Sequence, residues 1–366
     1  MLYKMFSLLP INKNRISILS DSRKTMSDNF QFVYDELQRK KNYSYYFLLK
    51  PSVKTRKRYI EIIQLAYNLA RSKVILLDDF YPMIYPLKIR KGADLIQIWH
   101  AVGAFKTFGF SRIGKPGGPK SDSNAHRNYT KAIVSSKYVA PFYAEGFGID
   151  ESCVVATGVP RTDVFFDESY KQQKIKEVYE KYPQFIGKRV ALYAPTFRGN
   201  GQSSAKFPKE QLDLDQIYEG LGEEDVFIIK MHPFVKKKIS IPEAYRDKIF
   251  DLTKYPNVNN LLFITDVLIT DYSSVCFEYA LLNKPMIFYC FDLEEYISAR
   301  DFYIPYEEFT PGEIVRDTEQ MVRVLQNQFN HPHVDYKDFT DKFFDDLDGK
   351  STERVADLVI SCMERK

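Results

Sequence analysis

The stretch Asp266-Val267-Leu268-Ile269-Thr270-Asp271-Tyr272-Ser273-Ser274 joins a short apolar run to a polar turn, and a second apolar run, from Val275 to Leu282, follows it. A buried strand that ends in a turn and continues into a helix is the repeating unit of parallel α/β sheets. In such sheets, ligands bind beyond the carboxyl ends of the strands. This stretch therefore predicts an α/β fold whose functional residues follow the strands.

The same pattern repeats along the chain in two series. The predicted strands are residues 16–19, 45–49, 73–77, 95–99, 132–135 and 153–156 in the first series, and 190–193, 226–230, 267–270 and 286–289 in the second. Helical stretches lie between them, and residues 55–72 show the clearest apolar face. Two such series predict two Rossmann-type domains with parallel sheets that face a cleft. We expect domains at residues 1–180 and 181–350, and a C-terminal helix at 351–366 that packs back on the first domain.

Charge is distributed unevenly along the chain. The net charge is +4, but residues 1–120 carry +14 and residues 121–366 carry −10. A basic first part indicates a polyanionic partner; an anionic membrane and a nucleic acid are the two candidates, and a solvated basic face without a partner is the alternative to both. The predicted membrane contact is the basic side of the helix at 55–72 with its neighbours: Lys54, Arg56, Lys57, Arg58, Arg90 and Lys91.

Several classes of protein and site are not indicated. No apolar run approaches the roughly 20 residues that span a bilayer, and residues 1–10 lack the features of a signal peptide, so we expect a cytoplasmic protein. The four cysteines form no CxxC pair, which argues against zinc and a disulfide framework. Asp213-Leu214-Asp215 imitates a metal-binding DxD, and His331-Pro332-His333 with Asp335 imitates a ligand cluster, yet both lie in polar stretches typical of solvated surface. The sequence therefore signals no cofactor, and it leaves a divalent metal open.

His100 is the first candidate catalytic residue. The predicted strand at 95–99 runs directly into it, and the small residues Ala101 and Gly103 follow. A histidine at this place can act as a general base near neutral pH. The alternative is a structural histidine whose ring bonds to a neighbouring carbonyl.

Candidate phosphate-binding residues follow three strands of the second series. Thr196 and Arg198 supply a hydroxyl and a guanidinium, although a loop arginine can also pair with a surface carboxylate. His232 lies between a strand and Pro233, where it is either a ligand of the donor or a structural histidine. After the third strand, Ser273 and Ser274 can bind a phosphate at a helix start, or cap that helix together with Asp271; Glu278, one turn further on, is placed to reach ribose hydroxyls.

Together these segments resemble a known family. WHAVG (99–103), YAPTFR (193–198), KMHP (230–233) and TDYSS (270–274), in this order, are similar to the CDP-glycerol:poly(glycerophosphate) glycerophosphotransferase family of teichoic acid biosynthesis. Further similar segments are GVPRTD (158–163), residues 288–296 with Asp292, Pro311-Gly312 and DGKSTER (348–354). The resemblance covers roughly residues 70–366.

The resemblance implies a GT-B-like fold, CDP-glycerol as donor and CMP as leaving group. His100 would be the catalytic base on the first domain, which would take the acceptor. The second domain would bind the donor through Thr196, Arg198, His232, Ser273, Ser274 and Glu278. Arg161 and Asp163 would orient either His100 or the donor, and Asp271 and Ser351 would be further supporting residues. The acceptor would be an undecaprenyl-diphosphate-linked ManNAc–GlcNAc disaccharide, and the protein would be peripheral at the cytoplasmic face of the cell membrane. No nucleic acid partner is expected.

One departure bears on the type of enzyme. Polymerases of the family usually read WHG followed by TPLK, whereas residues 101–107 read AVGAFKT here. This segment, the loop rich in glycine and proline after it, and the lack of an appended domain in this sequence are more similar to the primase type (TagB-like), which adds the first glycerol phosphate. The alternatives are a glycerol- or ribitol-phosphate polymerase, a GT-B glycosyltransferase that uses a UDP-sugar, and an idle binding module.

Overall fold

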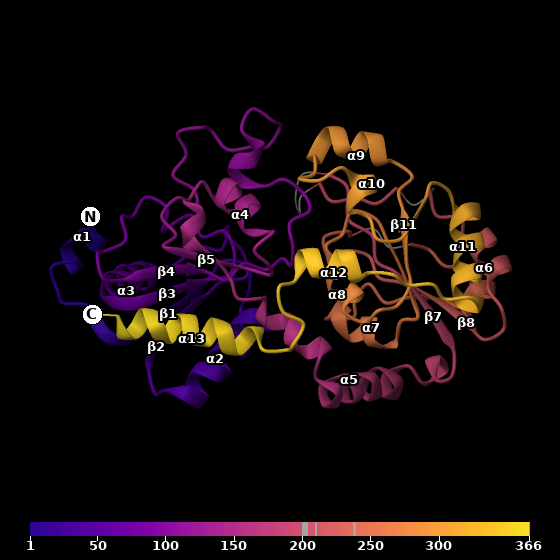
Figure 1. Cartoon of the computed structure of the whole chain (residues 1–366), viewed down its shortest axis with the longest axis horizontal. Helices are drawn as coiled ribbons and strands as arrows, with labels where there is room; N and C mark the ends of the chain where they lie inside the picture. The colour runs from indigo at the N-terminus through magenta and orange to yellow at the C-terminus, as the bar shows by residue number, and fades with distance from the viewer. Residues whose placement is uncertain (200–203, 209–210, 237–238, 366) are drawn as a thin grey trace. The chain divides into compact units, whose positions relative to one another are not determined.

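The computed structural model describes residues 1–199, 204–208, 211–236 and 239–365. The chain forms two compact units, each built on its own parallel sheet (Figure 1). Unit 1 comprises Met1–Phe166 and Lys342–Lys366, and unit 2 comprises Asp167–Asp341. The expected boundary at residue 180 falls at the end of helix α5 (Glu168–Lys181), whereas that helix packs against α7 (Val258–Ile264) within unit 2.

Unit 1 is built on a six-stranded sheet in which all neighbouring strands are parallel. The strand order is β2-β1-β3-β4-β5-β6, from β1 (Asn12–Ser20), β2 (Ser44–Leu49), β3 (Ser72–Leu77), β4 (Asp94–Gln97), β5 (Lys131–Val134) and β6 (Val154–Ala156). The central strand β3 is buried along its whole length. Its continuous burial is typical of a parallel sheet that is covered on both faces.

The helices of unit 1 come from both ends of the chain. They are α1 (Leu2–Phe6), α2 (Asp28–Lys40), α3 (Tyr59–Arg71), α4 (Ala140–Phe147) and α13 (Ser351–Glu364), with the 3-10 turns η1 (Gly109–Arg112), η2 (Glu151–Cys153) and η3 (Pro160–Phe165). Helix α13, yellow in Figure 1, packs along α2. Its apolar side chains Val355, Val359 and Met363 join the core formed by β1, β3 and β4. The last helix of the chain thus completes the first core.

Unit 2 repeats the architecture with the order β12-β11-β10-β7-β8-β9. Its strands are β7 (Arg189–Tyr193), β8 (Asp225–Ile229), β9 (Ile249–Asp251), β10 (Val267–Thr270), β11 (Met286–Tyr289) and β12 (Glu313–Val315). Its further helices are α6 (Leu214–Gly220), α8 (Val275–Ala280), α9 (Leu293–Arg300), α10 (Tyr306–Phe309) and α11 (Thr318–Asn330), with η4 (Pro183–Phe185) and η6 (Glu243–Tyr245). Helix α12 (Lys337–Phe343) contains the boundary to the last segment of unit 1. A second core contains Ile229, Ile269 and Ile287 from three of these strands.

The predicted α/β fold with two parallel sheets is confirmed. Every predicted strand corresponds to an observed one with shifts of a few residues at its ends. The sequence pattern misses β9 and β12, which are three residues long and lie at the two edges of the second sheet. Both contain an acidic residue and therefore lack the continuous apolar run that marks β6, which is equally short.

The predicted helix at 55–72 is wrong at its start, because α3 begins at Tyr59. The Glu61 carboxylate accepts the backbone N–H of Arg58 at 2.7 Å, which fixes the first turn. Lys57 turns inward instead, and its Nζ donates to both carboxylate oxygens of the buried Asp21 at 2.6 and 2.8 Å. Arg56, Lys57 and Arg58 therefore precede the helix and do not form a basic helix face.

Candidate functional site

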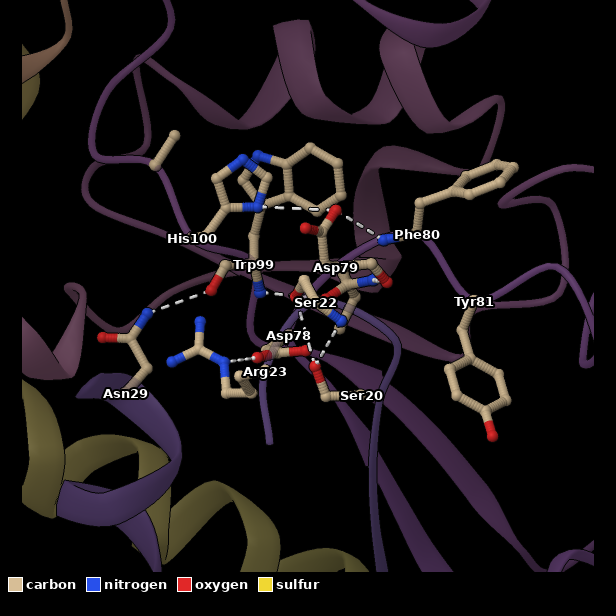
Figure 2. A network of polar contacts seen from close by, with 12 residues as sticks. Ser20, Ser22, Arg23, Asn29, Asp78, Asp79, Phe80, Tyr81, Trp99 and His100 are labelled. Atoms are coloured by element: carbon tan, nitrogen blue, oxygen red, sulfur yellow. Dashed lines mark hydrogen bonds and ion pairs between the residues drawn. The ribbon is translucent and has the colours of Figure 1, made fainter. Parts of the chain in front are cut away.

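His100 lies just beyond the carboxyl end of β4, and its side chain is 45% exposed. Its Nδ1 lies 3.7 Å from Oδ1 of Asp79, which follows the neighbouring strand β3 (Figure 2). The backbone N–H of Phe80 donates to the same Asp79 oxygen at 2.6 Å and holds the carboxylate in place. Adjacent parallel strands thus bring a histidine and a carboxylate together at one edge of the sheet.

The charge state of His100 suits a base. Although the ring keeps part of its surface in solvent, the protein around it desolvates the imidazole and lowers the pKa of His100 below its usual value. The Asp79 carboxylate opposes this shift, and the positive charge of Arg161 adds to it. His100 is therefore neutral at neutral pH, which is the form that accepts a proton.

Asp78 forms a second, buried charge pair at this edge. Its carboxylate contacts Nε of Arg23, which follows β1 (Figure 2). Arg23 also contacts Asp28 at the start of α2 at 2.9 Å. Burial raises the pKa of Asp78 to about 6, and Arg23 limits the increase. Sequence reasoning missed Asp78 and Asp79. The sequence did contain a signal for them: two acidic residues come directly after a buried apolar run, and the rule that selected His100 at a strand end would also have selected them.

Arg161 is connected to the His100 loop through Asn29 of α2. The Asn29 side chain donates through Nδ2 to the carbonyl of Trp99 at 3.0 Å and accepts the backbone N–H of Arg161 at 2.9 Å. Asp163 has another partner: its two carboxylate oxygens accept the backbone N–H groups of Ser351 (2.9 Å) and Thr352 (2.7 Å). The segments GVPRTD and DGKSTER therefore meet at the start of α13. There Asp163 accepts hydrogen bonds from two backbone N–H groups that have no acceptor within the helix.

The same two segments meet at Gly158, which has a φ of +79°. A Cβ atom there would lie 2.2 Å from Oγ of Ser351. Ser351 is itself buried. This close approach explains a glycine and a small side chain at the two positions, and it gives Ser351 a packing role in the structure.

In unit 2, the predicted donor residues follow three adjacent strands. His232 follows β8, Thr196 and Arg198 follow β7, and Ser273 and Ser274 follow β10. The order β10-β7-β8 in the sheet places these strands side by side. Because all three are parallel, their carboxyl ends lie at one edge, and the structure brings three motif segments of this unit together there, with Asp292 after the neighbouring strand β11 as a fourth.

Arg198 is held between two carboxylates. Its Nη1 donates to Asp271 at 2.9 Å, while Nε and Nη2 donate to the two oxygens of Asp292 at 2.6 and 2.8 Å. The rings of Tyr272 and Tyr296 lie 5.0 and 5.1 Å from the guanidinium carbon. The guanidinium N–H groups of Arg198 thus donate to groups of the protein itself. Direct phosphate binding by Arg198 therefore stays a prediction.

Asp271 joins the YAPTFR and TDYSS segments. Its side chain is 0% exposed, and Oδ1 accepts the backbone N–H of Thr196 at 2.7 Å and that of Tyr272 at 2.6 Å. The Thr196 carbonyl in turn accepts Nη1 of Arg198 at 2.7 Å. These bonds fix the backbone of both turns; a supporting role of Asp271 in donor binding stays a prediction.

His232 is oriented by its own turn. Its ring lies 4.7 Å from Phe197 and 4.6 Å from Phe234, centroid to centroid, and Nδ1 accepts the backbone N–H of Phe234 at 3.2 Å. A neutral imidazole whose Nδ1 accepts carries its proton on Nε2. The Nε2–H group is a donor suited to an anionic oxygen.

The remaining donor candidates differ in accessibility. Ser273 and Ser274 are half-buried, and Oγ of Ser273 accepts the N–H of Val275 at 3.4 Å, while Ser274 precedes α8. Glu278 lies on α8 with 1% of its side chain exposed, in the core of the unit. A contact between Glu278 and a ribose stays a prediction.

The described residues also bear on metals and small ligands. Among them, no group of three or more His, Cys, Asp or Glu side chains is placed to hold a metal ion. Asp213 of the DxD sequence begins α6 and accepts the N–H groups of Asp215 and Gln216 at 3.0 and 3.1 Å.

Beside the Arg198–Asp292 pair, a cavity of about 780 Å³ is lined by the aromatic rings of Phe197, Phe291 and Tyr296. Its size and its rings suit a nucleoside.

Comparison with known proteins gives one family. The model of the CDP-Glycerol:Poly(glycerophosphate) glycerophosphotransferase family matches residues 1–361. A teichoic acid poly(ribitol-phosphate) polymerase of Bacillus spizizenii is 53% identical over 366 residues, which is 100% of this chain and 59% of that protein. A teichoic acid ribitol-phosphate primase of the same organism is 39% identical over 98% of this chain and 94% of its own length. The chain thus spans about three fifths of the polymerase that it matches.

A solved structure supports the fold. The wall teichoic acid polymerase TagF superposes with a TM-score of 0.77 at 24% identity and covers 99% of this chain and 93% of the TagF chain. The predicted GT-B-like fold is confirmed by this similarity. Within the residues that the structure describes, no helix is both long enough and apolar enough to cross a membrane.

Proposed function

Because the chain belongs to the CDP-glycerol:poly(glycerophosphate) glycerophosphotransferase family, we propose that it transfers a polyol phosphate from a CDP-activated polyol to a teichoic acid acceptor. The observation that carries the proposal is the neutral His100 beside Asp79 at the carboxyl edge of the first sheet. A partly exposed base oriented by a carboxylate is what deprotonation of an acceptor hydroxyl requires.

The proposed step is a single displacement at phosphorus. The acceptor hydroxyl oxygen attacks the phosphorus that carries the polyol, a new O–P bond forms, and the bond to CMP breaks. Since Nδ1 of His100 faces Asp79, Nε2 accepts the hydroxyl proton. Nε2–H of His232 and the hydroxyls of Ser273 and Ser274 hold the diphosphate, and the cavity beside Arg198 takes the nucleoside. CMP leaves with the electron pair, and the bound donors stabilise its charge.

For the type of reaction, we favour polymerisation of ribitol phosphate. Identity is 53% to the ribitol-phosphate polymerase and 39% to the ribitol-phosphate primase. The expectation of a glycerol-phosphate primase rested on residues 101–107, on the loop rich in glycine and proline after them and on the lack of an appended domain in this sequence, and it is not confirmed. Identity over the whole chain weighs more than one loop, because loops vary most among relatives of one fold.

The test is transfer with defined donors and acceptors. The protein is incubated with CDP-ribitol, CDP-glycerol or a UDP-sugar and with a lipid-diphosphate-linked disaccharide, either bare or already carrying one polyol phosphate, and the products are analysed by mass. A ladder with ribitol-phosphate spacing on the primed acceptor supports the proposal. A single addition to the bare acceptor assigns a primase instead, and sugar transfer or no transfer with any donor overturns the proposed function.

We also propose that unit 1 contacts an anionic membrane, where a lipid-linked acceptor would lie. Lys54, Arg56, Arg58 and Lys91 are exposed, as predicted for this contact. Lys57 and Arg90 are not part of it: Lys57 binds Asp21, and Nη1 of Arg90 donates to the carbonyls of Leu9 (2.8 Å) and Ala70 (2.6 Å). Helix α1 packs against α3, and large apolar side chains of α1, of the residues after it and of the start of α3 are exposed: Met5, Leu8, Leu9, Tyr59, Ile60 and Ile63.

Apolar side chains beside exposed cations are the combination that binds an anionic lipid surface. Lys54→Glu/Arg56→Glu/Arg58→Glu should release the protein from vesicles containing phosphatidylglycerol, since each basic residue contributes on the order of 1 kcal/mol. Leu8→Ser/Ile60→Ser should weaken the same binding in high salt. A matched variant is Lys176→Glu/Lys181→Glu on α5 of unit 2, which should leave vesicle binding intact. Equal binding by all three variants would remove this surface from the proposal.

A further inference from the structure

Trp99, the residue before His100, has a backbone conformation that bulky residues rarely adopt. Its φ is +59°, in the left-handed region. Such a conformation persists only where the surrounding structure determines it. The Trp99 carbonyl accepts a hydrogen bond from Asn29 at 3.0 Å, and its ring lies 5.6 Å from Phe108 and 5.2 Å from Phe147. The direction in which His100 leaves the strand depends on this residue.

Gln97, the last residue of β4, binds the backbone N–H group of Trp99. Its side chain is fully buried, and Oε1 accepts the N–H of Trp99 at 2.9 Å. Nε2 of the same amide donates to the carbonyl of Asp79 at 3.1 Å and to the hydroxyl of Tyr129 at 3.0 Å. One amide group therefore binds the backbone of the residue next to His100 and the backbone of Asp79, the carboxylate partner of His100.

A second set of side chains fixes the orientation of that amide. The Tyr129 hydroxyl lies 2.8 Å from Nδ1 of His126 and 3.1 Å from the hydroxyl of Tyr85, and all three side chains are buried. Because Gln97 donates to the Tyr129 oxygen, the Tyr129 hydrogen points to His126 or Tyr85. Burial lowers the pKa of His126 to about 4, so its ring is neutral; in the tautomer that carries its proton on Nε2, Nδ1 accepts the Tyr129 hydrogen. If the oxygen and nitrogen of the Gln97 amide exchanged places, its NH₂ group would face the N–H of Trp99, and two donors would oppose each other.

We infer that Gln97 is the positioning residue that aligns His100 with Asp79, and that Tyr129, His126 and Tyr85 keep its amide in the active orientation. This inference rests on the proposed role of His100. Gln97 contacts neither a substrate nor the reacting atoms, and it acts by fixing two backbone segments at once. A misplacement of about 1 Å at a reacting group can cost on the order of 10²-fold in rate, which sets the scale of the effect.

The test uses Gln97→Met, which keeps the size of the side chain and removes its three hydrogen bonds. With CDP-ribitol and the primed acceptor, we expect kcat to fall by about 10–100-fold while the Kd for the donor is unchanged. In an Asp79→Asn background the same substitution should cost clearly less, because the pair that Gln97 aligns is already lost. If Gln97→Met does not fold, Gln97→Glu decides by the same criteria, since it keeps the acceptor for Trp99 and loses the donor to Asp79.

Gln328→Met is the matched control. Gln328 is a buried glutamine of α11 in unit 2, and its Oε1 accepts the N–H of His333 at 3.1 Å. This variant should lower thermal stability and keep kcat. A folded Gln97→Met enzyme with unchanged kcat overturns the inference, and so does an equal loss in the Asp79→Asn background. If His100→Ala itself keeps full activity, the proposed role of His100 as the base fails, while the proposed transfer reaction stands; if only Gln97→Met is without effect, the failure concerns Gln97 alone.

Discussion

The carboxyl edges of the two sheets come from the same sequence pattern, a buried strand followed by polar residues, yet they differ in how their charges are held. In unit 2, Arg198 is paired with Asp271 and Asp292, and the fully buried Asp271 also accepts two backbone N–H groups. In unit 1, His100 is 45% exposed and lies 3.7 Å from Asp79. The first arrangement fixes a backbone frame, and the second leaves a neutral base in reach of solvent.

This difference separates binding from chemistry. A buried ion pair with bidentate geometry resists rearrangement, because loss of one partner leaves an unpaired charge in the interior. An exposed imidazole costs little to hold and can exchange protons. We therefore expect substitutions at the edge of unit 2 to affect stability and donor affinity, and substitutions at the edge of unit 1 to affect turnover with little loss of stability.

The largest effect is expected for His100→Ala. Removal of a positioned general base should lower kcat by about 10²–10⁴-fold. Because the side chain is partly exposed, the melting temperature and the donor Kd should stay close to those of the parent protein. Turnover, calorimetric donor binding and thermal unfolding measure the three quantities. His331→Ala, an exposed histidine of unit 2, is the control and should change none of them. Near-normal kcat in a folded His100→Ala protein would exclude His100 as the base.

Arg198→Ala should produce the opposite pattern. It leaves Asp271 and Asp292 without their counter-charge, and the free energy of unfolding should fall by about 3–5 kcal/mol, with loss of donor binding. Denaturant titration and donor calorimetry test this. Arg189→Ala, which breaks a half-exposed pair with Asp225 at the other end of β7, should cost less and keep donor affinity. A stable Arg198→Ala protein that has lost only donor affinity would instead favour direct phosphate binding.

A smaller effect is expected in the pH profile. Below its pKa, His100 is protonated and cannot accept a proton, so kcat/KM falls as pH decreases. Since desolvation lowers the pKa of His100, the midpoint of this fall should lie below the ordinary value of 6.5. Asp79→Asn removes the carboxylate that raises the pKa and should move the midpoint to lower pH still. A midpoint above 6.5 in the parent protein would contradict the charge state described here.

The smallest effect tests Asp163, which was predicted to support the site. In the structure, Asp163 binds two N–H groups at the start of α13, so Asp163→Ala should lower the free energy of unfolding by about 0.5–2 kcal/mol. Thermal unfolding and turnover are measured together. Asp317→Ala, which removes the cap of α11 in unit 2, should cost a similar amount. A fall in kcat for Asp163→Ala alone would give Asp163 a role at His100 besides its role at α13.

The sequence by itself determined the class of fold and the order of its strands along the chain. Continuous apolar runs such as Ile75 to Leu77 specify buried parallel strands wherever they lie, since this preference is local. It also placed His100, His232 and Ser273 at strand ends, because the carboxyl edge of a parallel sheet follows from direction alone. The edge strands β9 and β12 and the start of α3 could not be predicted from the local pattern.

Only the tertiary structure decided which polar residues pair with one another. Asp79 faces His100, Asp292 and Asp271 hold Arg198, and Asp163 caps a helix almost two hundred residues away in sequence. Lys57, which the sequence suggested for a membrane contact, lies instead against Asp21. Such pairings depend on strand order and on the turns after each strand, which bring residues from distant segments within a few ångströms. Periodicity in the sequence holds no information on these distances, so a charged residue can be located by sequence but its partner cannot.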